Sequence, residues 1–121
     1  MNDYTIYHNP RCSKSRETLA LLEDARAAPR IIEYLKTPPT AAELKAIIAK
    51  LGIEPEQLVR KGEDVYKSHY AGKTLTAAQW IDAMVAHPVL IERPIVIKGN
   101  RAVIGRPPQN VKRLLSPQES E

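Results

Sequence analysis

The chain has 121 residues, a length that fits one domain. Hydrophobic residues make up 43% and charged residues 26% of it, which excludes a disordered or fibrous protein. The formal net charge of +4 is a mild excess that suits a small anionic ligand or an acidic partner. We expect no binding to nucleic acid, because the basic residues are interleaved with acids and because Phe is absent and aromatic residues are only 5% of the chain.

Cysteine usage and hydropathy narrow the class further. Cys12 is the single cysteine, so an intramolecular disulfide and a cysteine-rich zinc site are both excluded. The histidines His8, His69 and His87 lack a compact metal-ligand spacing, and we expect no metal. No apolar run approaches the ~20 residues of a membrane-spanning helix, and the first ten residues do not resemble a signal peptide. We therefore expect a cytoplasmic protein without membrane association.

The first predicted elements are a strand, a helix and a strand. Residues 4–7 alternate and are rich in β-formers, residues 12–27 carry an apolar face at helical spacing, and residues 31–35 form a second strand. Such a unit has parallel strands joined by a right-handed crossover. Ligands bind at the carboxyl end of the first strand in units of this kind, which places a site at residues 8–15.

The middle of the chain is predicted to be helical. A capping box at Thr40–Glu43 begins a helix, and Gly52 ends it. A short helix is expected over about residues 56–61, then a glycine-containing loop, and then a further helix over residues 76–87.

The last third returns to strands. Residues 94–97 and 102–104 are expected to pair as a hairpin, and a terminal helix follows Pro107 and Pro108. The order β-α-β, helical block, β-β-α predicts an α/β protein with a mixed sheet and a thioredoxin-like fold. We expect a single domain over residues 1–121, with the helices at about residues 40–87 as an insertion.

Cys12 lies at the head of the first predicted helix. Exposed N–H groups and the helix dipole favour an anion there, so the pKa of the thiol is expected to be lowered. A thiol with the ordinary pKa of ~8.5 is only about 3% ionised at pH 7. A free cysteine is often simply buried, but the polar neighbours Arg11 and Ser13–Ser15 favour an exposed, reactive thiol.

Ser15 stands where a C-x-x-C redox motif has its second cysteine. Its hydroxyl can donate a hydrogen bond to the Cys12 thiolate, but it cannot resolve a mixed disulfide. The reducing thiols must then come from outside the chain. The alternative interpretation is an ordinary serine in the first turn of a helix.

Three arginines that lie far apart in the sequence are candidates for binding a tetrahedral oxyanion: Arg60, Arg93 and Arg106. In a thioredoxin-like arrangement, the loop before the first hairpin strand comes beside a cysteine at the head of the first helix. Guanidinium groups that converge there would bind the oxyanion by charge-assisted, often bidentate hydrogen bonds. Taken singly, each arginine is more often a solvated surface charge. The phosphatase, Walker A and Rossmann motifs are absent.

Four separated segments of the chain resemble the glutaredoxin-coupled arsenate reductase family, often called ArsC. They are residues 7–16 (YHNPRCSKSR), 34–39 (YLKTPP), 92–96 (ERPIV) and 104–108 (IGRPP). They occur in the family's order and span nearly the whole chain. The resemblance implies a thioredoxin-like fold and the reduction of arsenate to arsenite. It also implies that no cofactor is tightly bound, and we expect a monomer.

The resemblance further implies a reaction cycle and a set of site residues. Cys12 attacks arsenate and forms a thiol–arsenate adduct, glutathione as co-substrate displaces and reduces it, and glutaredoxin clears the resulting mixed disulfide. His8 and Ser15 match residues that tune the thiolate. The bond between Arg93 and Pro94 corresponds to the cis-proline position of the fold. The family's oxyanion-holding arginines match Arg60, Arg93 and Arg106.

Two other functions stay open at this point. One is a related thiol oxidoreductase that acts on another oxyanion or on glutathione mixed disulfides. The other is a non-catalytic regulator that resembles the Spx proteins and binds RNA polymerase, but members of that branch commonly carry C-x-x-C, and Ser15 counts against it. The three arginines also favour an enzyme, since a binding module needs no oxyanion clamp.

Overall fold

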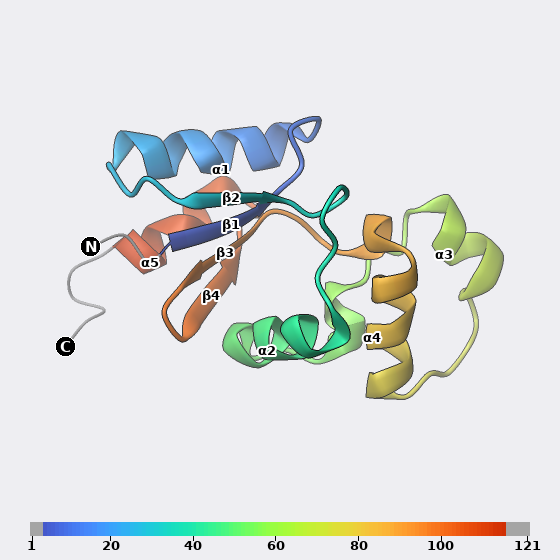
Figure 1. Cartoon of the computed structure of the whole chain (residues 1–121). Coiled ribbons are helices and arrows are strands. Elements are labelled where there is room, and N and C mark those ends of the chain that lie inside the picture. The colour runs from blue at the N-terminus through green and yellow to red at the C-terminus, as the bar shows by residue number, and fades with distance from the viewer. Residues whose placement is uncertain (1–3, 116–121) are drawn as a thin grey trace. The chain divides into compact units, whose positions relative to one another are not determined.

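The computed structural model describes residues 4–115, which divide into two compact units (Figure 1). The first, here called the thiol unit, comprises residues 4–37 and 93–115. The second, here called the helical unit, comprises residues 38–92. The remaining residues of the predicted domain, 1–3 and 116–121, lie outside the described residues.

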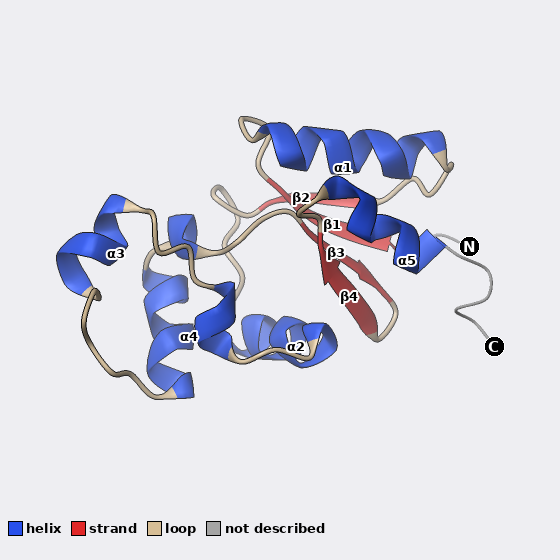
Figure 2. Cartoon of the chain, turned by 180° about the vertical axis from the view of Figure 1, so that it is seen from behind, coloured by secondary structure: helices blue, strands red, loops and turns tan. Residues whose placement is uncertain are grey.

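A four-stranded mixed sheet forms the centre of the thiol unit (Figure 2). Its strands are β1 (Tyr4–His8), β2 (Arg30–Glu33), β3 (Ile95–Lys98) and β4 (Arg101–Ile104), in the spatial order β2-β1-β3-β4. Strand β1 pairs in parallel with β2 and antiparallel with β3, and β3 pairs antiparallel with β4. The predicted α/β class, mixed sheet and thioredoxin-like arrangement are therefore confirmed.

The core of the thiol unit lies between the sheet and the helices of that unit. Helix α1 (Ser13–Asp24) follows β1, and a 3₁₀ helix (Pro108–Val111) leads into α5 (Lys112–Leu115). Alternate residues of β1 are buried, as expected for a strand with one covered face. The buried cluster joins both helical segments to three strands through Tyr4, Ile6, Leu22, Ala27, Val96, Val103, Val111 and Leu114.

The helical unit holds α2 (Ala41–Leu51), α3 (Asp64–His69) and α4 (Ala77–Ala86). Thr40 and Thr76 each begin a helix with a complete capping box, as the sequence predicts. Two short 3₁₀ helices, over Pro55–Leu58 and Pro88–Leu90, pack with α4. Apolar residues of α2 and α4 form the buried part of this unit, including Leu44, Ile47, Ile48, Trp80 and Met84.

Several element boundaries differ from the sequence prediction. Helix α1 ends at Asp24 rather than near residue 27, because Arg26 and Ala28 adopt positive φ values of 60° and 47°. The sequence analysis places a loop where α3 forms. This helix was missed because none of its residues is buried, so it carries no apolar stripe. No helix among residues 4–115 is long and apolar enough to span a membrane.

Candidate active site

A hydrogen-bonded turn carries Cys12 from the end of β1 to the start of α1. The Cys12 N–H donates to the Asn9 carbonyl at 3.0 Å, and the Arg11 N–H donates to Asn9 Oδ1 at 3.0 Å. Cys12 is the N-cap residue of α1, with an extended backbone, and its carbonyl accepts the first helical bond from Arg16 at 3.0 Å. The turn therefore holds the sulfur at the head of the helix, as predicted.

The environment of Cys12 lowers the pKa of its thiol. Burial acts in the opposite direction and raises the pKa, because the charged form loses water. The backbone N–H of Ser15, the side chain of Arg93 and the backbone N–H of Lys14 together outweigh that effect. Cys12 has no side-chain capping hydrogen bond, and the N–H groups of Ser15 and Lys14 favour the thiolate because they direct partial positive charge at the sulfur.

The thiol is less exposed than the sequence suggests. Only 8% of Cys12 is exposed, so the expectation of an exposed setting drawn from its polar neighbours was wrong. Arg11, Ser13 and Lys14 are exposed, but Ser15 is buried, and the sulfur faces Arg106, whose Nη2 lies 3.5 Å from Sγ. Charged groups therefore take the place of water around the sulfur, and this is why a buried thiol keeps a lowered pKa.

Arg93 and Arg106 flank the β3–β4 hairpin in the sequence, and the side chains of both reach Cys12. Arg93 precedes β3 and its side chain hydrogen bonds to the thiol, while Arg106 follows β4. The Nε of Arg106 donates to the Arg93 carbonyl at 2.8 Å, which fixes the two residues relative to each other. The predicted cis bond between Arg93 and Pro94 is confirmed, and a second cis bond precedes Pro107. The structure thus brings two of the three candidate arginines to the sulfur.

Arg60, the third candidate, lies in the helical unit among carboxylates. Its Nε donates to Glu63 at 3.1 Å and its Nη1 donates to Glu92 at 2.7 Å. Burial lowers the pKa of Arg60, but the two carboxylates outweigh this effect and raise it. The short helix predicted over about residues 56–61 ends before Arg60, since the 3₁₀ helix there stops at Leu58. Its assignment to the oxyanion stays a prediction.

His8 and Ser15 form a buried polar pair beside the turn. Their exposed fractions are 5% and 0%, and His8 Nδ1 lies 2.6 Å from the Ser15 hydroxyl oxygen. That oxygen also accepts a hydrogen bond from the Asn9 N–H at 3.0 Å. From the sequence, the hydroxyl could donate to the Cys12 thiolate. The structure pairs it with His8 and Asn9 instead, and it is the backbone N–H of Ser15 that acts on the sulfur.

His8 is held mainly in its neutral form. Burial is the largest cause, and it lowers the pKa of the imidazole because the charged ring would lose water. Arg16 lowers the pKa as well, while Glu33 and Glu23 act against it. In a neutral ring with Nδ1 unprotonated, that nitrogen accepts a hydrogen bond from the Ser15 hydroxyl, which fixes the orientation of the serine side chain.

Thr18 and Gly105 support the site and were not singled out from the sequence. Thr18 is fully buried, and its hydroxyl lies 2.8 Å from the Lys14 carbonyl and 3.4 Å from that of Gly105. A Cβ on Gly105 would come within 2.5 Å of the Thr18 hydroxyl and 2.9 Å of Pro94 Cγ. Glycine at this position therefore allows the chain before Arg106 to approach α1. Its place directly before Arg106 is the one sequence signal that could have indicated this.

Within residues 4–115, no three His, Cys, Asp or Glu side chains gather so that they could hold a metal ion.

Comparison with known proteins identifies the family of this chain. The ArsC family model matches residues 7–114. The protein YfgD of Escherichia coli K12, described as uncharacterized, is 48% identical over 108 residues, which are 88% of this chain and 91% of YfgD. The arsenate reductase of Haemophilus influenzae is 48% identical over 112 residues, which are 91% of this chain and 97% of that protein.

A solved structure agrees with the sequence relatives. The arsenate reductase from Vibrio cholerae superposes with a TM-score of 0.88 at 47% identity, covering 91% of this chain and 95% of that one. The matched span includes the Cys12 turn and both arginines that contact the sulfur. This chain therefore belongs to the ArsC family.

Proposed function

We propose that this protein is an arsenate reductase that uses glutathione as reductant and glutaredoxin as redox partner. The observation that carries the proposal is the Cys12 thiol, whose pKa is lowered and which lies against Arg93 and Arg106. Membership of the ArsC family and 48% identity to an arsenate reductase support arsenate as the substrate. We expect it to act as a monomer in the cytoplasm, where thiols are kept reduced.

The proposed reaction transfers two electrons from thiols to arsenic. The Cys12 thiolate attacks As(V), forming a sulfur–arsenic bond as one arsenate oxygen leaves as water. A glutathione thiolate then attacks the Cys12 sulfur, so that a mixed disulfide forms, the sulfur–arsenic bond breaks and its electron pair stays on arsenic as As(III). Glutaredoxin and a second glutathione reduce the mixed disulfide and regenerate the thiolate. In sum, arsenate and two glutathione molecules yield arsenite, glutathione disulfide and water.

Electrostatics explains why this chemistry needs the arginines. Two unit negative charges 4 Å apart repel by roughly 1 kcal/mol in water and by roughly 4 kcal/mol at the effective dielectric of a protein surface. A thiolate and an arsenate oxyanion must approach more closely than that. Arg106 already has one nitrogen 3.5 Å from the sulfur, and Arg93 hydrogen bonds to the same sulfur. Their guanidinium groups offset the repulsion and offer further N–H donors to the oxyanion.

The other site residues have supporting roles in the proposal. Ser15 acts on the thiolate through its backbone N–H, and its hydroxyl is oriented by the neutral ring of His8. Arg60 is retained as a third oxyanion ligand on the strength of the family resemblance alone. Neither a metal nor a tightly bound cofactor is required by the reaction as written.

One coupled assay tests the proposal. Oxidation of NADPH is followed through glutathione reductase, with glutathione, glutaredoxin and the protein present, at increasing arsenate. We expect an arsenate-dependent rate that Cys12→Ser abolishes, because a serine hydroxyl cannot form the adduct or the disulfide. No arsenate-dependent rate in the wild-type protein would overturn the proposal.

A second substrate class deserves an arm of the same assay. The identity to YfgD equals that to the Haemophilus arsenate reductase, and YfgD is described as uncharacterized. Two guanidinium groups at a thiol would suit any tetrahedral oxyanion, and the same thiol could exchange with glutathione mixed disulfides. A rate that depends on a glutathionylated peptide and not on arsenate would favour this second function.

A further inference from the structure

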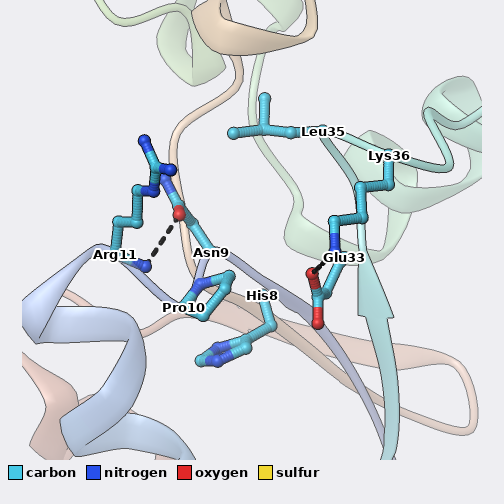
Figure 3. A pocket seen from close by; sticks show the side chains of 7 residues that line it. All are labelled: His8, Asn9, Pro10, Arg11, Glu33, Leu35 and Lys36. Atoms are coloured by element: carbon cyan, nitrogen blue, oxygen red, sulfur yellow. Dashed lines mark hydrogen bonds and ion pairs between the residues drawn. The ribbon is translucent and has the colours of Figure 1, made fainter.

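A pocket opens beside the turn that carries Cys12 (Figure 3). Its volume is about 230 Å³, and all of its lining residues belong to the thiol unit. One wall is the stretch between β1 and α1, and the other is the end of β2 with the residues that follow it. The lining consists of His8, Asn9, Pro10, Arg11, Glu33, Leu35 and Lys36.

The first wall of the pocket and the thiol are parts of the same turn. Asn9 lines the pocket, and its carbonyl accepts the hydrogen bond from the Cys12 N–H at 3.0 Å. Arg11, which directly precedes Cys12, is exposed and projects from this wall. A tripeptide spans at most about 10 Å when extended. A molecule of that length held in the pocket therefore lies against the turn that carries Cys12.

The second wall carries a charge pair that a ligand can replace. Lys36 Nζ lies 3.3 Å from Glu33 Oε1, and the two side chains are 81% and 39% exposed. An exposed ion pair of this kind contributes only about 0–1 kcal/mol to stability. Lys36 and Glu33 can therefore separate, and each can pair with a charged group of a ligand instead. Leu35 adds an apolar surface, since it remains 46% exposed. Arg11 forms no ion pair with any residue in the described part of the chain.

The mixture of charges in the pocket distinguishes it from an oxyanion site. Arsenate carries only negative charge, and Glu33 would repel it. Glutathione is a zwitterion in which one carboxylate and the ammonium group share a carbon atom, and methylene groups and two amide bonds join them to the second carboxylate. Arg11 and Lys36 match the carboxylates, Glu33 matches the ammonium group, and Leu35 can contact the methylene groups between them.

We propose that this pocket binds glutathione and directs its thiol to Cys12, with Arg11 and Lys36 on its carboxylates and Glu33 on its ammonium group. The inference rests on the proposed function, because it assigns a place to the reductant of that reaction. In this proposal, Lys36 determines specificity for the thiol substrate, glutathione, and does not bind arsenate.

Binding is tested first, and without turnover. S-methylglutathione cannot react, and it is titrated into ¹⁵N-labelled wild-type protein while amide signals are followed by NMR. We expect shifts concentrated at residues 9, 11 and 33–36, with affinity weakened about two- to fivefold by Lys36→Ala. Lys73→Ala removes an exposed lysine of the helical unit and should leave the affinity unchanged. The absence of shifts at both walls would overturn the inference whatever the protein's activity.

Kinetics then separates the inference from the proposed function. With arsenate saturating and glutathione varied, Lys36→Ala should raise the KM for glutathione about two- to fivefold, with kcat and the KM for arsenate unchanged. Lys36→Arg should restore the wild-type value. If Lys36→Ala reduces arsenate with the same KM for glutathione as Lys73→Ala, the glutathione pocket is contradicted and the proposed function is not. If the wild-type protein shows no arsenate-dependent turnover, the proposed function is contradicted.

A glutathione ester identifies the contact chemically. Esterifying the glycyl carboxylate removes one of the two negative charges, so wild-type protein should use the ester less well than glutathione. One of the two cations, Lys36 or Arg11, binds the glycyl carboxylate in this proposal. The preference for glutathione over the ester should shrink in the alanine variant of that cation, because the esterification and the substitution remove the same interaction. A preference that persists in both variants would show that neither cation binds this carboxylate.

Discussion

The two units of the protein use arginine in opposite ways. In the thiol unit, Arg93 and Arg106 lie against a sulfur that is neutral or anionic depending on pH. In the helical unit, Arg60 donates to the side chains of two glutamates, Glu63 and Glu92. A cation beside an ionisable sulfur stabilises the charge that the chemistry needs. A cation between two carboxylates already has its counter-charges, and an incoming oxyanion must compete with them.

The helix N-termini of the two units differ in the same way. Thr40 and Thr76 cap their helices through the side-chain oxygen, and each box satisfies two backbone N–H groups. Cys12 occupies the equivalent position of α1 with a sulfur that forms no such bond. Helices α2 and α4 thus have N-termini closed by side-chain caps, whereas N–H groups at the start of α1 act on a reactive group.

The largest expected effect separates Arg106 from Arg60. Arg106→Ala removes a guanidinium group 3.5 Å from the sulfur, and we expect kcat/KM for arsenate to fall by about 10²-fold. Arg106→Lys keeps the positive charge but loses the planar guanidinium group, so its kcat/KM for arsenate should lie between those of the wild type and Arg106→Ala. Arg60→Ala should cost less, because its charge is already balanced by two carboxylates. Equal losses for Arg60→Ala and Arg106→Ala in the coupled assay would break the comparison between the units.

The next largest expected effect is on stability, and it is tested by replacing one glycine in each unit with alanine. Gly105→Ala would place a Cβ 2.5 Å from the Thr18 hydroxyl, and we expect it to lower the free energy of unfolding by about 1–3 kcal/mol. Gly62→Ala in the helical unit is the matched control, since no atom lies within 4 Å of its added Cβ. Urea denaturation of both variants measures the difference. A Gly105→Ala protein as stable as Gly62→Ala would show that α1 and the segment before Arg106 can separate at little cost.

The pH dependence of Cys12 measures the field of the thiol unit directly. The pKa of Cys12 is lowered, so its alkylation by iodoacetamide should be half-maximal below the ordinary thiol value of ~8.5. Arg93→Ala removes a hydrogen bond and a positive charge that favour the thiolate, and should move the midpoint upward. Arg60→Ala serves as the control. An Arg93→Ala midpoint that equals the wild-type midpoint would remove Arg93 from the stabilisation of the thiolate.

Local signals in the sequence predicted most of the fold. Both capping boxes, the strand-helix-strand start and the hairpin were predicted correctly, because each is encoded by residues within a few positions of one another. Helix α3 lacks buried residues and therefore any apolar periodicity. Its existence depends on its surroundings rather than on a pattern in its own residues.

The site was harder to predict than the fold because its groups come from distant positions. Cys12 at the helix start follows from adjacent residues, but its 8% exposure depends on Arg106, which is 94 positions away. The Glu63 partner of Arg60 is three residues along and could have been predicted, whereas Glu92 could not. The Ser15 hydroxyl has several donors and acceptors within reach, and only coordinates show that it pairs with His8.

The smallest expected effects are opposite in sign at the two kinds of helix start. Thr40→Ala removes a complete capping box and should lower the free energy of unfolding by about 1 kcal/mol. Cys12→Ser replaces a sulfur with a good capping oxygen, and should raise it by up to about 1 kcal/mol at acid pH, where the thiol is neutral.

The gain from Cys12→Ser should shrink as the pH rises. The pKa of Cys12 is lower in the folded protein than in the unfolded chain, so the thiolate contributes stability that is complete above the unfolded pKa of ~8.5 and lost as the pH falls through the folded pKa. Urea denaturation of both proteins at several pH values gives the difference. If the stability gained by Cys12→Ser is independent of pH, the folded protein does not favour the thiolate. The start of α1 would then not differ from the capped helix starts in stabilising a reactive anion.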